Sequence, residues 1–219
     1  MIETGLKELD KFLGGGIKDG LITSISGQSA TGKTQLIFQI CVNALHNGKE
    51  ILFQDTIGEF RPERLVEMMQ LQKINSSLLD KIKVNRITNT AQQIDCLSKT
   101  SPERYSLIIV DSVTDLFSFE YSKKEQSLEK YISFMKYMHN LSSIAIDGKI
   151  PIIVTNIVRT INKHEKENLE ESISMYTHTK IKLSKNSNGY LCHVISPFVN
   201  KKFQYTITSS GLVDESQSI

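Results

Sequence analysis

Gly27-Gln28-Ser29-Ala30-Thr31-Gly32-Lys33-Thr34 is the stretch of sequence that decides the fold. It matches the phosphate-binding pattern G-x-x-x-x-G-K-[ST] at every fixed position. The apolar run at residues 21–26 predicts a strand before it, and residues 33–47 predict a helix after it that ends at Gly48. A loop between a strand and a helix N-terminus is the setting in which this motif binds phosphate. We therefore predict a nucleotide-binding loop.

The loop and a second segment supply groups suited to ATP and Mg²⁺. Backbone N–H groups of the loop would face the phosphates, Lys33 would reach the β- and γ-phosphates, and the Thr34 hydroxyl would bind Mg²⁺. Residues 106–111 predict a buried strand that ends in Asp111, a second candidate ligand for the metal. Alone, such an aspartate would more simply cap the next turn. The candidate nucleotide-binding residues are Gly27, Gln28, Ser29, Ala30, Thr31, Gly32, Lys33, Thr34 and Gln35.

Short apolar runs alternate with helical patterns over the first two thirds of the chain. The further strands are expected at residues 50–54, 81–87, 106–111 and 150–155, and the further helices at residues 62–70, 90–98 and 127–146. This order predicts an α/β fold with a mainly parallel, twisted sheet flanked by helices on both faces. In the longest helix we expect one buried stripe, made of Leu128, Ile132, Met135, Met138 and Leu141.

The last third of the chain has a different pattern. Residues 158–175 are charged and lack periodicity, which predicts a mobile loop. Residues 176–183, 190–196 and 202–208 are strand-like and have short spacers, which predicts an antiparallel extension of the sheet. The polar residues 211–219 are expected to form a frayed tail. The whole chain, 1–219, is then expected to be a single domain.

Composition excludes several classes of protein. A length of 219 residues suits one large domain, and a net charge of +2 gives no general attraction to polyanions. The three cysteines lack CxxC spacing, so we expect neither disulfides nor a zinc site, and a reducing cytoplasmic setting. The apolar runs are of strand length, and the first ten residues lack a signal-peptide core. Secreted, membrane and fibrous classes are therefore not expected.

Several segments together resemble the RecA-type recombinases, in their archaeal and eukaryotic branch. These segments are residues 4–17 (TGLKELDKFLGGGI), 32–36 (GKTQL), 55–65 (DTIGEFRPERL), 108–117 (IIVDSVTDLF) and 154–156 (VTN). Within that branch the chain is most similar to the short archaeal RadB group. About 26 residues precede the phosphate loop, and we expect them to leave no room for the helical domain and polymerisation linker of the full recombinase.

The resemblance implies a RecA-type P-loop core that binds ATP and Mg²⁺. It implies a role in DNA repair and homologous recombination, as an accessory protein that regulates a RadA-like strand-exchange recombinase. It further implies a cytoplasmic, nucleoid-associated location and weak binding of DNA, mainly single-stranded. The family's sensor residue corresponds to Asn156.

Two departures from the family's pattern predict weak or absent ATP hydrolysis. The family's turn reads Asp-Thr-Glu-Gly, and its Glu positions the attacking water, but this chain has Ile57 at that place. The family's sensor strand ends in Gln where this chain has Ile157. Loss of a water-positioning base lowers the rate by about 10²–10⁴-fold. Glu59 is a candidate replacement base, two residues further on.

Four basic residues are candidates for DNA contact. Arg159 and Lys163 lie in the segment that binds single-stranded DNA in the family, and Lys180 and Lys182 share one face of an expected strand. The alternative interpretations are a solvated loop and a sheet edge protected by lysine. No aromatic platform accompanies either pair.

Three other functions compete with the accessory role. The chain is alternatively an active DNA-dependent ATPase that uses Glu59 as its base. It is alternatively a KaiC-like signalling ATPase, since that group shares the segment Gly14-Gly15-Gly16. A structural subunit that binds no nucleotide is the third alternative.

Overall fold

The computed structural model describes residues 1–45, 48–161, 164–196 and 199–215. The strands are β1 (Ile22–Gly27), β2 (Glu50–Asp55), β3 (Ile82–Arg86), β4 (Tyr105–Asp111), β5 (Ile152–Ile161), β6 (His164–Glu167), β7 (Thr177–Asn186), β8 (Gly189–Ser196), β9 (Val199–Thr208) and β10 (Gly211–Asp214). The helices are α1 (Lys7–Leu13), α2 (Lys33–Ala44), α3 (Pro62–Leu71), α4 (Thr90–Ser98), α5 (Asp115–Glu120), α6 (Ser127–Gly148) and α7 (Glu170–Ser174). Short 3-10 turns are η2 (Ser76–Lys81), η3 (Pro102–Arg104) and η4 (Lys124–Gln126).

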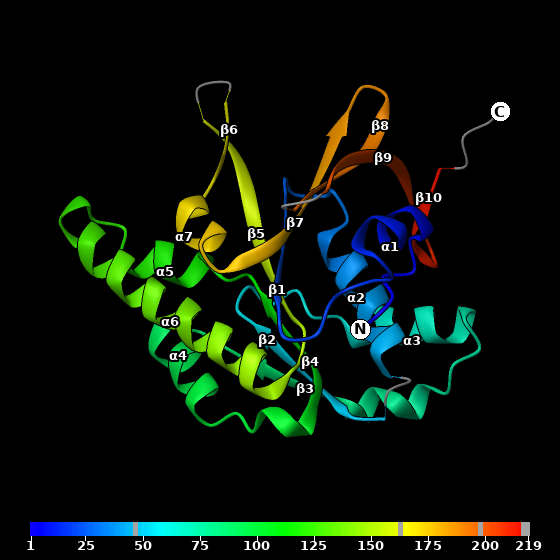
Figure 1. Cartoon of the computed structure of the whole chain (residues 1–219), viewed down its shortest axis with the longest axis horizontal. Coiled ribbons are helices and arrows are strands. Elements are labelled where there is room, and N and C mark those ends of the chain that lie inside the picture. The colour runs from blue at the N-terminus through cyan, green and yellow to red at the C-terminus, as the bar shows by residue number, and fades with distance from the viewer. Residues whose placement is uncertain (46–47, 162–163, 197–198, 216–219) are drawn as a thin grey trace.

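The strands form one sheet in the order β10-β9-β8-β7-β1-β5-β4-β2-β3, and β6 pairs with β5 beside this path. Strands β7, β1, β5, β4, β2 and β3 run parallel to one another. Strands β8, β9 and β10 are antiparallel to their neighbours. The predicted parallel sheet with an antiparallel C-terminal extension is therefore confirmed (Figure 1).

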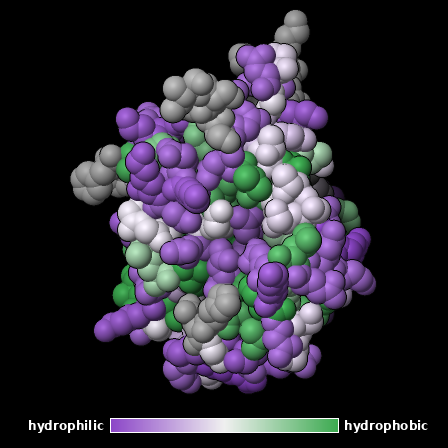
Figure 2. All heavy atoms as spheres, turned by 90° about the vertical axis from the view of Figure 1, so that its right-hand side faces the viewer, coloured by the Kyte–Doolittle hydropathy of each residue, from purple (hydrophilic) through white to green (hydrophobic). Residues whose placement is uncertain are grey.

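Helices cover both faces of the parallel part of the sheet. Successive strand residues point to opposite faces. Leu107 and Ile109 of β4 belong to the hydrophobic cluster that includes residues of α1, α2 and α3, whereas Ile108 and Val110 belong to the cluster that includes residues of α4, α5 and α6. All residues of β4 are buried, as expected for a parallel strand covered on both faces. On the outer side of α1, α3 and β10, hydrophilic residues surround small, separate hydrophobic patches (Figure 2). No helix in the described ranges has the length and apolar character needed to cross a membrane.

The expected stripe of α6 is wrong in its first half. Leu128 is 69% exposed and Ile132 is 45% exposed. The buried residues of this helix are Phe134, Tyr137, Met138, Leu141 and Ala145. With 22 residues α6 is about 33 Å long, whereas the seven residues of β4 span about 23 Å. Its first turns therefore extend past the sheet, where the apolar side chains have no core to contact.

The segment 158–175, expected to be a loop, contains two strands and a helix in its described part. β5 continues to Ile161 and pairs with β6, Val158 opposite Glu167. Helix α7 follows, and its Ile173 is buried in the core beside α6. Backbone hydrogen bonds hold a hairpin of this kind, and the hairpin extends beyond the helices (Figure 1). A projecting hairpin has no core to cover, so its sequence lacks apolar alternation.

The expectation of a frayed tail from residue 211 is also wrong for residues 211–214. They form β10, whose Leu212 is 2% exposed. Gln39 of α2 holds this strand through its side-chain amide, which donates to the Leu212 oxygen over 3.2 Å and accepts from the Leu212 nitrogen over 2.8 Å. The pairing with β9, the amide contact and the burial of Leu212 hold these four residues in place. Residues 216–219 lie outside the described residues.

Candidate nucleotide-binding site

The phosphate loop joins β1 to the N-terminus of α2, as the motif predicts. Gly27 is packed so tightly that a Cβ there would lie 2.3 Å from the Leu183 oxygen and 2.7 Å from the Thr31 hydroxyl. Gly32 has φ +88° and caps α2 in the left-handed region, which favours glycine. The two fixed glycines of the motif thus meet two different steric demands, a close approach and a left-handed turn.

A cavity of about 240 Å³ lies beside this loop. Its walls come from the loop and α2, from the turn after β2, and from the carboxyl ends of β4 and β5. The lining residues are Ser29, Ala30, Gly32, Lys33, Thr34, Gln35, Ile57, Glu59, Asp111 and Ile157. Residues from four segments of the sequence therefore meet at one edge of the sheet, where parallel α/β folds bind ligands.

Lys33 is the sole lysine or arginine among the lining residues of the described chain. Its ammonium donates to the carbonyl oxygens of Gly27 and Gln28, both over 2.9 Å. Burial lowers the pKa of Lys33, and the carboxylates of Asp111 and Glu59 oppose this shift. Two carbonyl oxygens of the phosphate loop thus hold the ammonium beside the cavity, where a bound anion could take their place.

Asp111 ends β4 at the bottom of the cavity and is 3% exposed. The hydroxyl of Thr155 on β5 donates to its carboxylate. Burial raises the pKa of Asp111 to about 6, and the Thr155 hydrogen bond and the Lys33 ammonium reduce the shift. Glu59 adds to the rise. Burial and the nearby acidic groups make the ionised form of this carboxyl unfavourable, and a bound cation would stabilise it.

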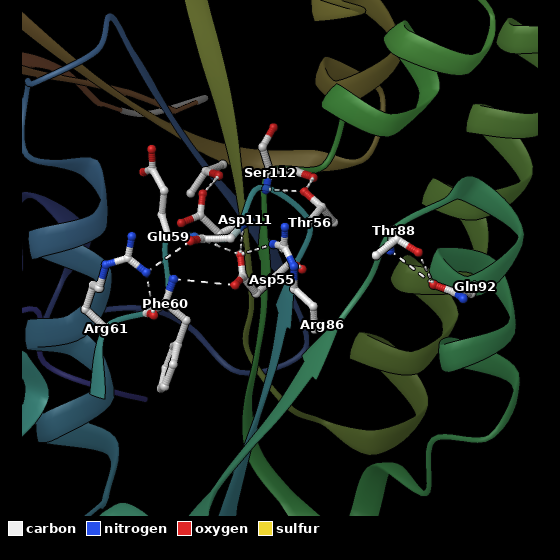
Figure 3. Close-up of polar contacts among 12 residues, drawn as sticks. Asp55, Thr56, Glu59, Phe60, Arg61, Arg86, Thr88, Gln92, Asp111 and Ser112 are labelled. Atoms are coloured by element: carbon white, nitrogen blue, oxygen red, sulfur yellow. Dashed lines mark hydrogen bonds and ion pairs between the residues drawn. The ribbon is translucent and has the colours of Figure 1, made fainter. Parts of the chain in front are cut away.

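The turn after β2 is built around the carboxylate of Asp55 (Figure 3). It accepts backbone hydrogen bonds from Gly58 over 2.7 Å, Glu59 over 3.2 Å and Phe60 over 3.4 Å. Arg86 of β3 forms an ion pair with the same carboxylate over 3.2 Å. These contacts fix the loop that carries the side chains facing the cavity.

Thr56 ties the same turn to the end of β4. Its hydroxyl donates to the Ser112 oxygen over 2.8 Å and accepts from the Ser112 nitrogen over 2.7 Å (Figure 3). Its backbone nitrogen donates to the Asp111 oxygen over 2.8 Å. The turn after β2 is therefore fixed in position relative to Asp111, the candidate metal ligand.

Both residues that depart from the family's pattern face the cavity. Ile57, in the turn after β2, and Ile157, on β5, are both among its lining residues. Glu59 lines it too, and its charge acts on both Lys33 and Asp111. The cavity therefore combines a phosphate loop and a carboxylate with two apolar side chains.

Asn156, the expected sensor, is not among the lining residues. It is fully buried, and its side-chain oxygen accepts from the Thr114 hydroxyl over 2.7 Å and from the Ile157 nitrogen over 3.0 Å. Its side-chain nitrogen donates to the Asn168 oxygen over 2.9 Å. Asn156 thus joins β5 to α5 and to the segment between β6 and α7.

Two of the basic candidates for DNA contact, Lys180 and Lys182, are not among the residues that line the cavity. Lys180 and Lys182 are on β7, which is an interior strand between β1 and β8, so the edge-protection alternative does not apply. Lys180 lies 3.9 Å from a carboxylate oxygen of Glu170 on α7. The backbone of Arg159 belongs to β5, and Lys163 lies outside the described residues.

The donor set fits a magnesium nucleotide. A helix N-terminus and an ammonium suit phosphate, and a hydroxyl with a carboxylate suits Mg²⁺. Thr34 and Asp111 are the lining residues that supply the second pair. The described residues contain no group of three or more His, Cys, Asp or Glu arranged to hold a metal.

Sequence reasoning did not identify the supporting groups Asp55, Arg86 and Thr155. The sequence gives a weak signal for Asp55, because an aspartate that precedes a turn often accepts hydrogen bonds from the backbone N–H groups of that turn. For Arg86 and Thr155 the sequence carried no local signal, since their partners lie on other strands.

Comparison with known proteins identifies DNA repair and meiotic recombination proteins as relatives. The family model described as Rad51 matches residues 1–214. The DNA repair protein Rad51 homolog of Drosophila melanogaster is 34% identical over 168 residues, which are 72% of this chain and 50% of the relative. The meiotic recombination protein DMC1 homolog A of Oryza sativa subsp. japonica is also 34% identical, over 72% of this chain and 49% of its own length. The chain thus spans about half the length of these relatives.

A solved structure matches nearly the whole chain. The crystal structure of the RadB recombinase superposes with a TM-score of 0.81 and 28% identity, covering 99% of this chain and all of the other. The likeness therefore includes the antiparallel strands as well as the parallel core.

Proposed function

Since this chain belongs to the Rad51 family, we propose that it is a recombination accessory protein of the RadB kind. It binds ATP with Mg²⁺, contacts DNA weakly and regulates a RadA-like strand-exchange recombinase in DNA repair. It is a cytoplasmic protein that associates with the nucleoid. The family relationship supports the DNA repair role, and the cavity chemistry supports the nucleotide.

The presence of Ile57 in the cavity wall is the observation that carries the proposal of weak hydrolysis. An isoleucine side chain neither accepts a proton nor orients a water molecule. Ile157 faces the same cavity, so this second position offers no polar contact to a nucleotide either. The binding groups are retained, whereas the groups that would drive turnover are replaced by aliphatic side chains.

The chain's own residues divide the work of binding. Lys33 leaves the carbonyls of Gly27 and Gln28 and pairs with the phosphates, while the N-terminus of α2 adds its backbone N–H groups. Thr34 and Asp111 would hold Mg²⁺, which would supply positive charge to the phosphates. A bound cation would also compensate the buried carboxylate of Asp111.

Weak DNA contact is proposed for Arg159, Lys163, Lys180 and Lys182. The ion pair of Lys180 with Glu170 lowers its availability for phosphate. The neighbouring sequence includes Glu165 and Glu167 as well, so the local charge does not favour a polyanion. These observations support weak binding.

An active ATPase is the second candidate function, and one observation favours it. Glu59 lines the cavity and lies close enough to Lys33 and Asp111 to influence the pKa of both. In this alternative Glu59 acts as the base in place of Ile57. The Rad51 match favours either recombinase-type function over the KaiC-like alternative.

A titration with ATP and Mg²⁺, followed by a turnover assay with and without single-stranded DNA, tests the proposal. We expect saturable binding and turnover far below the ~10 per second of a typical enzyme. Brisk turnover that Glu59→Ala abolishes would establish the second candidate. Absence of ATP binding would instead establish the structural subunit.

A further inference from the structure

The C-terminal hairpin of β9 and β10 packs directly against the phosphate loop. A Cβ on Gly32 would lie 3.1 Å from the Ile207 side chain and 3.2 Å from the Leu212 side chain. The double amide contact of Gln39 with Leu212 fixes the hairpin to α2, the helix that the loop opens. The hairpin and the loop therefore form one packed unit, although they are far apart in the sequence.

Tyr205 of β9 makes a polar contact with the loop itself. Its hydroxyl donates to the carbonyl oxygen of Thr31 over 2.6 Å, and both residues are buried. Burial raises the pKa of Tyr205. The phenol therefore stays protonated and remains a donor at all working pH values.

This contact fixes the orientation of a peptide that borders the cavity. In a planar trans peptide the C=O of one residue and the N–H of the next point in opposite directions. The Thr31 carbonyl points to Tyr205, so the N–H of Gly32 points away from Tyr205. Gly32 lines the cavity, whereas Tyr205 does not. The side chain of Thr31 is held separately, by donation to the Gln28 oxygen over 2.8 Å.

We propose that Tyr205 is a positioning residue for phosphate binding, which turns the Gly32 N–H toward the phosphates by holding the Thr31 carbonyl. This inference rests on the proposed nucleotide binding. Without the hydroxyl, the Thr31–Gly32 peptide populates other orientations in the free protein. A ligand then binds only the competent fraction, and its apparent affinity falls by that fraction.

Tyr205→Phe tests the inference because it removes the donor and retains the ring, whose centroid lies 5.5 Å from that of Tyr190. Calorimetric titration with MgATP and with tripolyphosphate is the measurement. We expect both ligands to bind about three- to tenfold more weakly, the effect of one buried hydrogen bond that orients a binding group. Tyr190→Phe is the matched control, since it removes a hydroxyl from the neighbouring ring, and we expect unchanged affinities.

A purely structural role predicts a different result. The melting temperature of the free Tyr205→Phe protein would fall, while both affinities would match those of the wild type; that outcome overturns the inference and leaves the proposed function intact. A loss confined to MgATP would also overturn it, because the contact would then act on the nucleoside. If the wild type binds neither ligand, the proposed function fails and the inference fails with it.

Discussion

Replacement of Asp111 by asparagine should change how the stability of the nucleotide-free protein depends on pH. Burial raises the pKa of this carboxyl from 3.8 to about 6. The folded protein therefore binds the proton more tightly than the unfolded chain does. The contribution of this carboxyl to the free energy of unfolding is therefore fully present below about pH 4 and is lost as the pH rises through about 6.

The magnitude follows from the size of the shift. About two pKa units at about 1.4 kcal/mol each give about 3 kcal/mol in total. Roughly half of this change falls between pH 5 and pH 8, because titration in the unfolded chain is nearly complete by pH 5. Asp111→Asn does not titrate, so its free energy of unfolding relative to the wild type should rise by about 1.5 kcal/mol over that interval.

Urea unfolding of both proteins at pH 5, 6, 7 and 8, with a chelator present, measures this difference. Thr155→Val provides a second comparison, because it removes the hydrogen bond that lowers the pKa of Asp111. The wild-type stability should then depend on pH less steeply than that of Thr155→Val. If the difference in the free energy of unfolding between wild type and Asp111→Asn stays constant from pH 5 to pH 8, burial does not raise the pKa of Asp111 and the reasoning is refuted.

Two further predictions concern binding and packing. Lys33→Ala removes the cation of the cavity and should weaken MgATP binding by at least about tenfold in a titration, since bonds to charged groups contribute about 1.5–3 kcal/mol; equal affinities would contradict the site. Phe134→Ala should lower the free energy of unfolding by about 3–5 kcal/mol, whereas Leu128→Ala should change it by less than about 0.5 kcal/mol, because the first is fully buried and the second exposed. Equal losses in urea denaturation would contradict the position of α6.

The phosphate loop and the mainly parallel sheet could be predicted because their signals are local. The motif fixes four positions within eight consecutive residues, and the buried strand before Asp111 is a continuous apolar run. The chain segments that meet at the cavity follow from these two facts, since parallel strands place their carboxyl ends at one edge. The family resemblance predicts Ile57 and Ile157 at this site, and both residues line the cavity.

Other features of the structure could not be predicted, because they depend on contacts between distant parts of the chain. The apolar stripe on α6 predicts that Leu128 and Ile132 are buried, but it does not show where the helix extends past the sheet. Both residues lie in that extended part and are exposed. β6 is held by backbone pairing with β5, which leaves little trace in hydrophobic patterning. β10 has only four residues and depends on pairing with β9 and on the distant Gln39, neither of which the local sequence indicates. The contact of Tyr205 with the phosphate loop spans 174 residues, and no local pattern indicates it.

Steady-state ATP hydrolysis by wild type and Ile57→Glu, measured side by side, tests the central claim most directly. The account predicts saturable ATP binding by both proteins, very slow turnover by the wild type, and faster turnover by the variant. The rise should be substantial, since a positioned base contributes about 10²–10⁴-fold where the rest of the site is in place. A wild type that already turns over at ~10 per second, with no gain in Ile57→Glu, would contradict the account.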